Sequence, residues 1–275
     1  MSVTVIRPAA SAWLHVGDHL ARLREYGDLL YTLSVHRIGV RYKQTSLGFT
    51  WALLQPVLMM VIFTAVFSRL AKMPSDGAPY ALFAYAALLP WSFFNTAVSG
   101  GTNSLVAHAP LITKVYFPRE ILPLTYVVAA LFDFAIGSIV LFALMYWYAV
   151  PVTVHALLLA PIVLLLALWI LAVSLVLAAV QVRFRDIGVA LPVLMQILMF
   201  ASPVIYPLSV VPESWRPWYL LNPLAGIVSS FRDVLLRQTM PDAYPLGAAC
   251  LVTAVVLPAA YMFFKHAEAT MADLI

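Results

Sequence analysis

Asp133 is the one acidic residue that the sequence places deep within a long apolar stretch. A carboxylate inside a membrane is costly, and it usually faces a cavity or a partner group. We expect a structural polar contact for Asp133, with a pore-lining role and proton coupling as the alternatives. Proton coupling normally needs a relay of several such groups, and the other apolar stretches supply none. The residue pattern alone does not decide the role of Asp133.

Sequence motifs for catalysis are missing. The chain has no G-x-x-x-x-G-K-[ST] loop for a nucleotide, and the nearest glycine cluster, Gly100-Gly101-Thr102, lacks the lysine. The patterns H-E-x-x-H, C-x-x-C and G-x-S-x-G are also absent. The six histidines are scattered, and Cys250 is the single cysteine. The sequence therefore predicts no catalytic residue, no metal site and no cofactor bound by this chain.

The composition indicates a membrane protein. Of 275 residues, 63% are apolar and 10% charged, whereas soluble domains carry about 25% charged residues. A helix crosses a bilayer with about 20 apolar residues. Six stretches meet this need: 52–70, 80–98, 122–147, 156–180, 187–206 and 246–264. The expected fold is an all-α integral membrane protein, with residues 1–275 forming a single transmembrane domain and spans 1–5 within 52–206.

The basic residues predict the orientation. With six spans, both termini and the second and fourth loops share one side, and eleven of the sixteen Lys and Arg residues fall there. Because cytoplasmic loops are enriched in basic residues, we expect both termini in the cytoplasm. These residues form no dense stripe, so no nucleic-acid partner is indicated.

Residues 13–43 predict an amphipathic helix at the cytoplasmic membrane surface. Its apolar positions recur every three or four residues, at Leu20, Leu23, Tyr26, Leu30 and Leu33. Arg37, Arg41 and Lys43 follow, where anionic headgroups would meet them. Because polar residues continue through Lys43, we expect no cleavable signal peptide.

Residues 207–245 are too interrupted for a plain span and too apolar for a solvated loop. Prolines break the segment, and Trp215 and Trp218 suit the headgroup level of a membrane. Asn222-Pro223 predicts a helix N-cap followed by proline at the first helical position. We expect short re-entrant helices that dip into the outer leaflet before the last span.

Five segments in order resemble the membrane subunit of ABC-2 type polysaccharide exporters. They are residues 41–48 with Trp51 and Gln55-Pro56, then 89–94, 111–120, 183–187, and 222–224 with Phe231-Arg232. The O-antigen and teichoic-acid branch is the most similar, because the capsule-exporting branch tends to have an acidic residue where Gln55 stands.

The resemblance implies a homodimer of six-helix subunits that binds two separate ATP-binding cassette subunits. ATP and Mg would be bound by those partners, so this chain is expected to be a transport subunit and no enzyme. The expected cargo is an undecaprenyl-diphosphate-linked glycan, such as the O-antigen of lipopolysaccharide. It would move outward across the bacterial plasma (inner) membrane.

The resemblance also suggests roles for particular residues. A coupling element at 104–118 and an interface helix at 29–41 would contact the ATPase, and Arg41 and Lys43 would attract the lipid diphosphate. The expected coupling residues are Leu111, Lys114, Tyr116, Phe117, Arg119 and Arg37. The expected channel aromatics, whose alternative is a lipid-facing belt, are Tyr85, Trp91, Phe93, Phe94 and Phe132. The resemblance places an outer gate at residues 207–236. The expected gate residues are Tyr206, which immediately precedes this segment, and Trp215, Trp218, Asn222 and Pro223.

Two other functions compete with polysaccharide export. An ABC exporter of another lipid or of a small molecule would share the same fold. A membrane-embedded transferase would show clustered His, Asp or Glu at one membrane depth, where the sequence offers only Asp133.

Overall fold

A computed structural model describes residues 25–43 and 50–274, and every regular element in these residues is helical. The long helices are α2 (Gly27–Lys43), α3 (Thr50–Phe63), α4 (Tyr80–Ala107), α6 (Ile121–Trp147), α7 (Leu159–Arg183), α8 (Ile187–Phe200), α10 (Pro223–Arg232) and α11 (Ala243–Leu274). The short helices are α5 (Ala109–Lys114) and α9 (Arg216–Tyr219), the 3₁₀ turns η2 (Val154–Leu158) and η3 (Leu208–Val210), and the π-helical turns η1 (Thr64–Leu70) and η4 (Asp233–Arg237).

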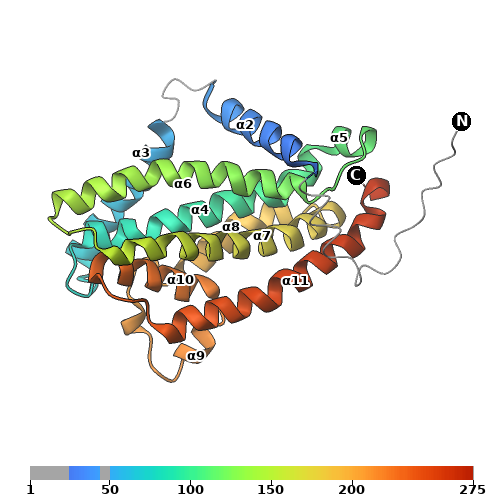
Figure 1. The fold of residues 1–275 in the computed structure, drawn as a ribbon. Coiled ribbons are helices and arrows are strands. Elements are labelled where there is room, and N and C mark those ends of the chain that lie inside the picture. Colours follow the sequence, from blue (N-terminus) through green and yellow to red (C-terminus); the bar gives the residue numbers. More distant parts are fainter. Residues whose placement is uncertain (1–24, 44–49, 275) are drawn as a thin grey trace, which may run out of the picture.

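Helix α4 is the centre of the bundle. It packs against α6 on one side and α7 on another, while α11 packs on α7 and α2 lies along part of α6 (Figure 1). We name the two ends of the bundle after short helices. The α5 end holds α5 and the C-terminal part of α11, and the α9 end holds α9, α10 and η4 (Figure 1).

Small residues let α4 and α6 approach closely. A Cβ atom added to Gly137 of α6 would lie 2.6 Å from Leu89 of α4, and the hydroxyl of Tyr85 donates to the Gly137 carbonyl. A Cβ added to Gly100 would lie 2.2 Å from the Tyr126 ring. Because helices in lipid associate through close packing, these glycines explain why α4 is buried along most of its length.

Five helical segments of the described chain are long and apolar enough to cross a membrane. They correspond to the predicted spans 52–70, 80–98, 122–147, 156–180 and 246–264, and α4 and α11 extend beyond the predicted ends. The sixth prediction, 187–206, is only partly met, because α8 has 14 residues and is therefore about 21 Å long. After Phe200 the chain turns, and the Tyr206 hydroxyl donates to the Phe200 carbonyl.

The segment 207–245 contains short helices, as its prolines predict. The predicted N-cap is present: the side-chain oxygen of Asn222 accepts a hydrogen bond from the Leu224 amide at 3.1 Å, and Pro223 is the first residue of α10. At the other end of the chain, α2 covers the described part of the predicted interface helix, while residues 13–24 lie outside the described residues.

Candidate functional site

A polar cavity lies between α2, α4 and α6. Its volume is about 660 Å³. Its wall on α4 is a stripe of amide, hydroxyl and glycine positions in an otherwise apolar helix. The stripe, which includes Ser92 from an adjoining smaller cavity, consists of Ser92, Asn95, Thr96, Ser99, Gly100 and Asn103. Because residues three, four and seven apart share one helix face, these side chains point in the same direction.

Asp133 joins α6 to the end of α2 at this cavity. Its two carboxylate oxygens accept hydrogen bonds from the Arg41 guanidinium, at 2.5 Å, and from the Tyr42 hydroxyl. Asp133 lies twelve residues after Ile121, about 18 Å along α6, so the contact is near the middle of that helix. Burial and the bond to Asp133 raise the pKa of the Tyr42 phenol, which keeps it a donor. The polar contact that the sequence predicts for Asp133 is therefore present.

Arg37 takes part in the same wall. Its guanidinium lies over the Tyr126 ring, 4.1 Å from the centroid, a geometry that favours a cation on an aromatic face. Arg37 and Arg41 are one helical turn apart on α2, and Tyr126 and Asp133 are two turns apart on α6. The two helices therefore meet through a cation–π contact and an ion pair. Lys43 is the last residue of α2, and its side chain lies outside the description.

At the α5 end, the predicted coupling residues differ in exposure. Tyr116 is 87% exposed and Lys114 is exposed, whereas Leu111 is half-buried and Phe117 is buried. The half-buried Arg119 turns towards α11, where its guanidinium donates to the Glu268 carbonyl at 2.7 Å. Their role in coupling stays a prediction.

Behind these residues lies a buried ionic network, which we call the Lys265 cluster. The Lys265 ammonium, 12% exposed, contacts carboxylate oxygens of Glu120 at 2.7 Å and of Glu268 at 2.8 Å. The Tyr261 hydroxyl donates to the other oxygen of Glu120. Glu120 is the N-cap residue of α6, while Lys265 and Glu268 belong to α11, so the cluster joins the predicted coupling loop to the last helix.

At the α9 end, the buried Arg232 connects α10 to α4 and to residues 203–206. Its guanidinium donates to the carbonyls of Phe83, Pro203, Val204 and Tyr206 and stacks over the Phe83 ring, 3.5 Å from the centroid. Four carbonyl acceptors replace the water that a buried guanidinium loses. Arg232 therefore anchors the segment that the family resemblance predicts to be an outer gate.

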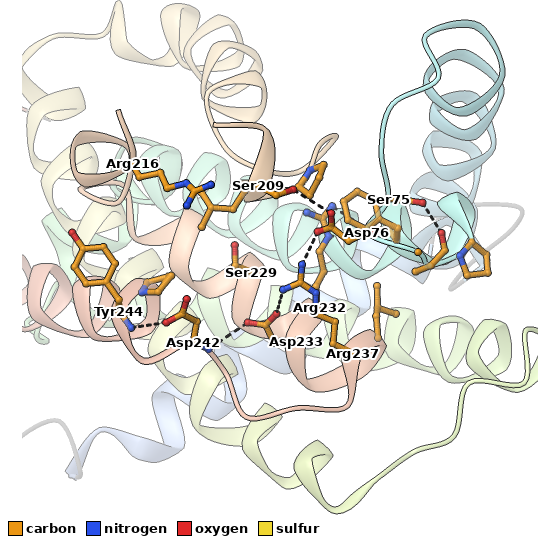
Figure 2. Close-up of a pocket in the computed structure, with 18 of the residues that line it drawn as sticks. Ser75, Asp76, Ser209, Arg216, Ser229, Arg232, Asp233, Arg237, Asp242 and Tyr244 are labelled. Carbon is orange, nitrogen blue, oxygen red and sulfur yellow. Dashed lines mark hydrogen bonds and ion pairs between the residues drawn. The ribbon is translucent and has the colours of Figure 1, made fainter. Parts of the chain in front are cut away.

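Beside Arg232 lies an open cavity of about 610 Å³ (Figure 2). Arg237 spans it, pairing with Asp76 at 2.7 Å and with Asp233 at 2.9 Å (Figure 2). Asp76 also accepts a hydrogen bond from Ser209. We call Asp76, Asp233 and Arg237 the Arg237 bridge. It joins the turn before α4 to η4 and to the chain around η3.

The other predicted gate residues surround this end. The hydroxyl groups of Tyr206 and Tyr219 hydrogen-bond at 2.8 Å, and the Asn222 amide donates to the Ser202 hydroxyl. Trp215 and Trp218 are exposed, as a position at the headgroup level would require.

The predicted channel aromatics lie mostly inside the subunit. Tyr85, Trp91, Phe93 and Phe94 are buried in the core, whereas Phe132 is 40% exposed. Trp91 and Phe93 border a small cavity that also touches Asp133. Their role along a path stays a prediction.

Two features were missed by sequence reasoning. The polar stripe of α4 has a helical period that could have been recognised in residues 92–103, across the predicted end of the second span. The Lys265 cluster had no such signal, because Glu120 and Lys265 are 145 residues apart. In the described residues, no group of three His, Cys, Asp or Glu side chains could hold a metal ion.

Comparison with known proteins places this arrangement in a family. The ABC-2 type transporter family model matches residues 29–236. The O-antigen export system permease protein RfbA of Myxococcus xanthus is 34% identical over 255 residues, covering 92% of this chain and 97% of the relative. RfbA of Klebsiella pneumoniae is 24% identical, covering 79% and 83%. The polysialic acid transport protein KpsM of Escherichia coli is 23% identical, covering 87% and 93%. The chain is therefore a multi-pass membrane protein that belongs to the ABC-2 type transporter family.

Proposed function

We propose that this chain is the channel-forming permease of an ATP-driven exporter that moves a lipid-linked polysaccharide outward across the bacterial inner membrane. The observation that carries the proposal is the match, over nearly the whole chain, to a permease named for O-antigen export. The polar cavity between α2, α4 and α6 supports it, because a hydroxyl-rich cargo needs hydrogen-bonding groups inside an apolar bundle.

The working unit in this proposal is a homodimer with six spans per subunit. Helix α8 serves as the fifth span. Because its 14 residues are short for a full crossing, the bilayer would thin around it. The α5 end faces the cytoplasm and the α9 end faces outward, in keeping with the basic residues. The segment 207–245 then forms the re-entrant outer gate, held by Arg232.

The partner at the α5 end is an ATP-binding cassette subunit, which binds ATP and Mg. Val115 and Tyr116 on the loop after α5, and Phe184 after α7, are exposed apolar side chains at this end. An exposed aromatic and aliphatic patch of this kind is typical of a protein contact. Motion of the ATPase would reach α6 and α11 together, because the Lys265 cluster joins them to the same loop.

The cargo in this proposal carries a diphosphate at its lipid end. Arg41 and Lys43 at the end of α2 would attract that group, and the aromatic residues predicted for the channel would contact the sugars. No covalent chemistry is assigned to this chain.

The experiment that tests the function combines genetics and copurification. Deleting the gene in its own host should leave lipid-linked polysaccharide inside the cell, and the wild-type chain should restore surface polysaccharide. The chain should copurify with an ATPase subunit whose turnover rises with lipid-linked glycan. A lone chain with normal surface polysaccharide in the deletion strain would contradict the proposal.

Tyr116→Ala provides a sharper test of the ATPase surface. Because Tyr116 is 87% exposed, removing its side chain should change the free energy of unfolding by less than about 0.5 kcal/mol. ATPase copurification should fall severalfold. Tyr146→Ala is the matched control, since Tyr146 is 89% exposed at the α9 end of α6 and should leave copurification unchanged.

A further inference from the structure

The contact between Asp133 and Arg41 forms part of the wall of the cavity between α2, α4 and α6. Arg41, Tyr42 and Asp133 all line this cavity. The side chain of Arg41 is 43% exposed, while that of Asp133 is 16% exposed. A molecule in the cavity would therefore reach the guanidinium without crossing packed side chains. The ion pair is open to exchange from one side.

The charges on the cavity wall do not balance. Its lining includes two guanidinium groups, Arg37 and Arg41, and one carboxylate, Asp133. Among the described residues, none places a carboxylate within ion-pair distance of Arg37, which lies over the Tyr126 ring instead. The wall therefore has an excess positive charge, which favours an anion.

Neutral donors stand beside the two arginines. Asn95 and Thr96 of α4 line the cavity and are half-buried. In the part of the chain that the structure describes, neither side chain is hydrogen-bonded to another residue. An anion with several oxygens could accept from the guanidinium groups and from these donors together. Phosphate oxygens suit this combination of donors, because arginine binds them with charge-assisted, bidentate hydrogen bonds.

The two halves of α2 are held differently. Near its start, Leu29, Leu30 and Leu33 pack on a cluster of buried apolar residues at the α5 end. Near its end, Arg41 and Tyr42 meet α6 through Asp133. Apolar packing has no small-molecule substitute, whereas an ionic contact can be replaced by a ligand of the same charge. Only the end of α2 is therefore exchangeable.

We propose that Asp133 binds Arg41 while the cavity is empty and that a phosphate ligand takes its place. The diphosphate of a polyprenyl-linked glycan binds in the cavity, takes Arg41 from Asp133, and releases the last turn of α2 from α6. This inference rests on the proposed function, which supplies a lipid diphosphate as cargo. It adds a regulatory consequence: the helix expected to face the ATPase changes its attachment when cargo is loaded.

The test measures binding of undecaprenyl diphosphate, without glycan, to the complete transporter in phosphatidylcholine nanodiscs. Asp133→Asn keeps the shape and an acceptor for Tyr42 but removes the competing charge. We expect about tenfold tighter binding, the size of one charge-assisted hydrogen bond. Arg41→Gln should weaken binding by about the same factor. Asp186→Asn, an exposed carboxylate outside the cavity, is the matched control and should leave the affinity unchanged.

A second measurement follows the helix itself. Hydrogen exchange of residues 38–42 in the wild-type transporter should become faster when undecaprenyl diphosphate is added. In Asp133→Asn it should be faster than in the wild type even without the lipid, because the ion pair with Arg41 is lost. A purely structural role for Asp133 would loosen α2 in the variant but would not tighten binding, and that result overturns the proposal.

Two competitors identify the source of the phosphate. Inorganic diphosphate should compete with the probe, because it offers the same oxygens. Phosphatidylglycerol at equal concentration should compete weakly, since its single phosphodiester has fewer oxygens to offer. Equal competition by phosphatidylglycerol would overturn the assignment to a lipid diphosphate.

The test of the exchange at Asp133 can fail independently of the test of the proposed function. Binding and exchange are measured without transport, whereas the function is tested by surface polysaccharide in the deletion strain. Normal rescue of export with unchanged or weaker binding by Asp133→Asn would remove this inference and leave the function. Tighter binding with no role in surface polysaccharide would leave the site and remove the function.

Discussion

The two ends of the bundle each contain a three-residue ionic cluster, and the clusters differ in their exposure to solvent. In the Lys265 cluster, the cation is 12% exposed and its Glu120 partner 6%. In the Arg237 bridge, the cation is 52% exposed and spans the wall of an open cavity. Each cation contacts two carboxylates, so the chemistry is alike and the surroundings differ.

Because of this difference, we expect the ion pairs of the Lys265 cluster to stay closed and those of the Arg237 bridge to open more easily. Buried charges resist separation, because a lone partner would be left without water. Exposed charges exchange with water and salt at little cost. We therefore expect the α5 end to move as a unit and the ion pairs at the α9 end to separate more easily. In the proposed function, these properties would suit the contact with the ATPase and the outer gate.

The largest effect is expected from Lys265→Met. The substitution fills a similar volume but leaves Glu120 and Glu268 facing each other without a cation. Breaking a buried pair on one side costs about 3–5 kcal/mol, so we expect a large fall in the melting temperature of the detergent-purified transporter. Lys265→Arg keeps the charge and is the control. A melting temperature equal to wild type would show that the Lys265 cluster does not hold the start of α6 to α11.

A smaller effect is expected from Arg237→Gln. It removes both ion pairs of an exposed cation, while Asp233, whose side chain is 8% exposed, keeps the hydrogen bond from the Asp242 amide. The loss in free energy of unfolding should therefore be about 1 kcal/mol. The wild-type protein should lose part of that stability as salt is raised, and the variant should not. Thermal unfolding at low and high sodium chloride measures both. The same salt series should barely change the contribution of Lys265, and equal salt dependence at the two ends would remove the contrast between them.

The smallest expected change in salt dependence tests whether the ion pairs of the Arg237 bridge can open separately from α10. Asn222→Ala removes the cap of α10, which should cost about 1 kcal/mol yet leave the salt dependence as in wild type. Asn222→Asp keeps an acceptor for the Leu224 amide and should recover most of that loss. Chemical or thermal unfolding of the three proteins checks the order. A salt-dependent loss in Asn222→Ala would mean that α10 and the bridge open together.

Local features of the fold follow from the sequence. The spans 80–98 and 122–147 were predicted from apolar length, and the cap at Asn222 from one residue pair. The predicted second span ended at residue 98, whereas α4 continues through Gly100 and Gly101 to Ala107. In the structure they are contact points, with Ser174 2.8 Å from a Cβ added to Gly101. A glycine pair in a sequence does not show whether it ends a helix or admits a neighbour.

The pairing of charges could not be predicted in the same way. Asp133 was expected to have a polar partner, but Arg41 is 92 residues away in the sequence. The family resemblance suggests a coupling role for Arg119, and the structure shows its side chain hydrogen-bonded to α11. Such contacts depend on the packing of distant helices, which helical periodicity does not report.

Arg232 also sets an order in which the protein is made. Its guanidinium needs the carbonyls of Phe83, at the start of α4, and of Pro203 and Val204. Synthesis proceeds from the N-terminus, so these acceptors leave the ribosome before α10 does. An arginine without partners is costly in lipid, so we expect α10 to enter the bundle only after α4. The segment that holds α10 would then join helices that are already in the bilayer.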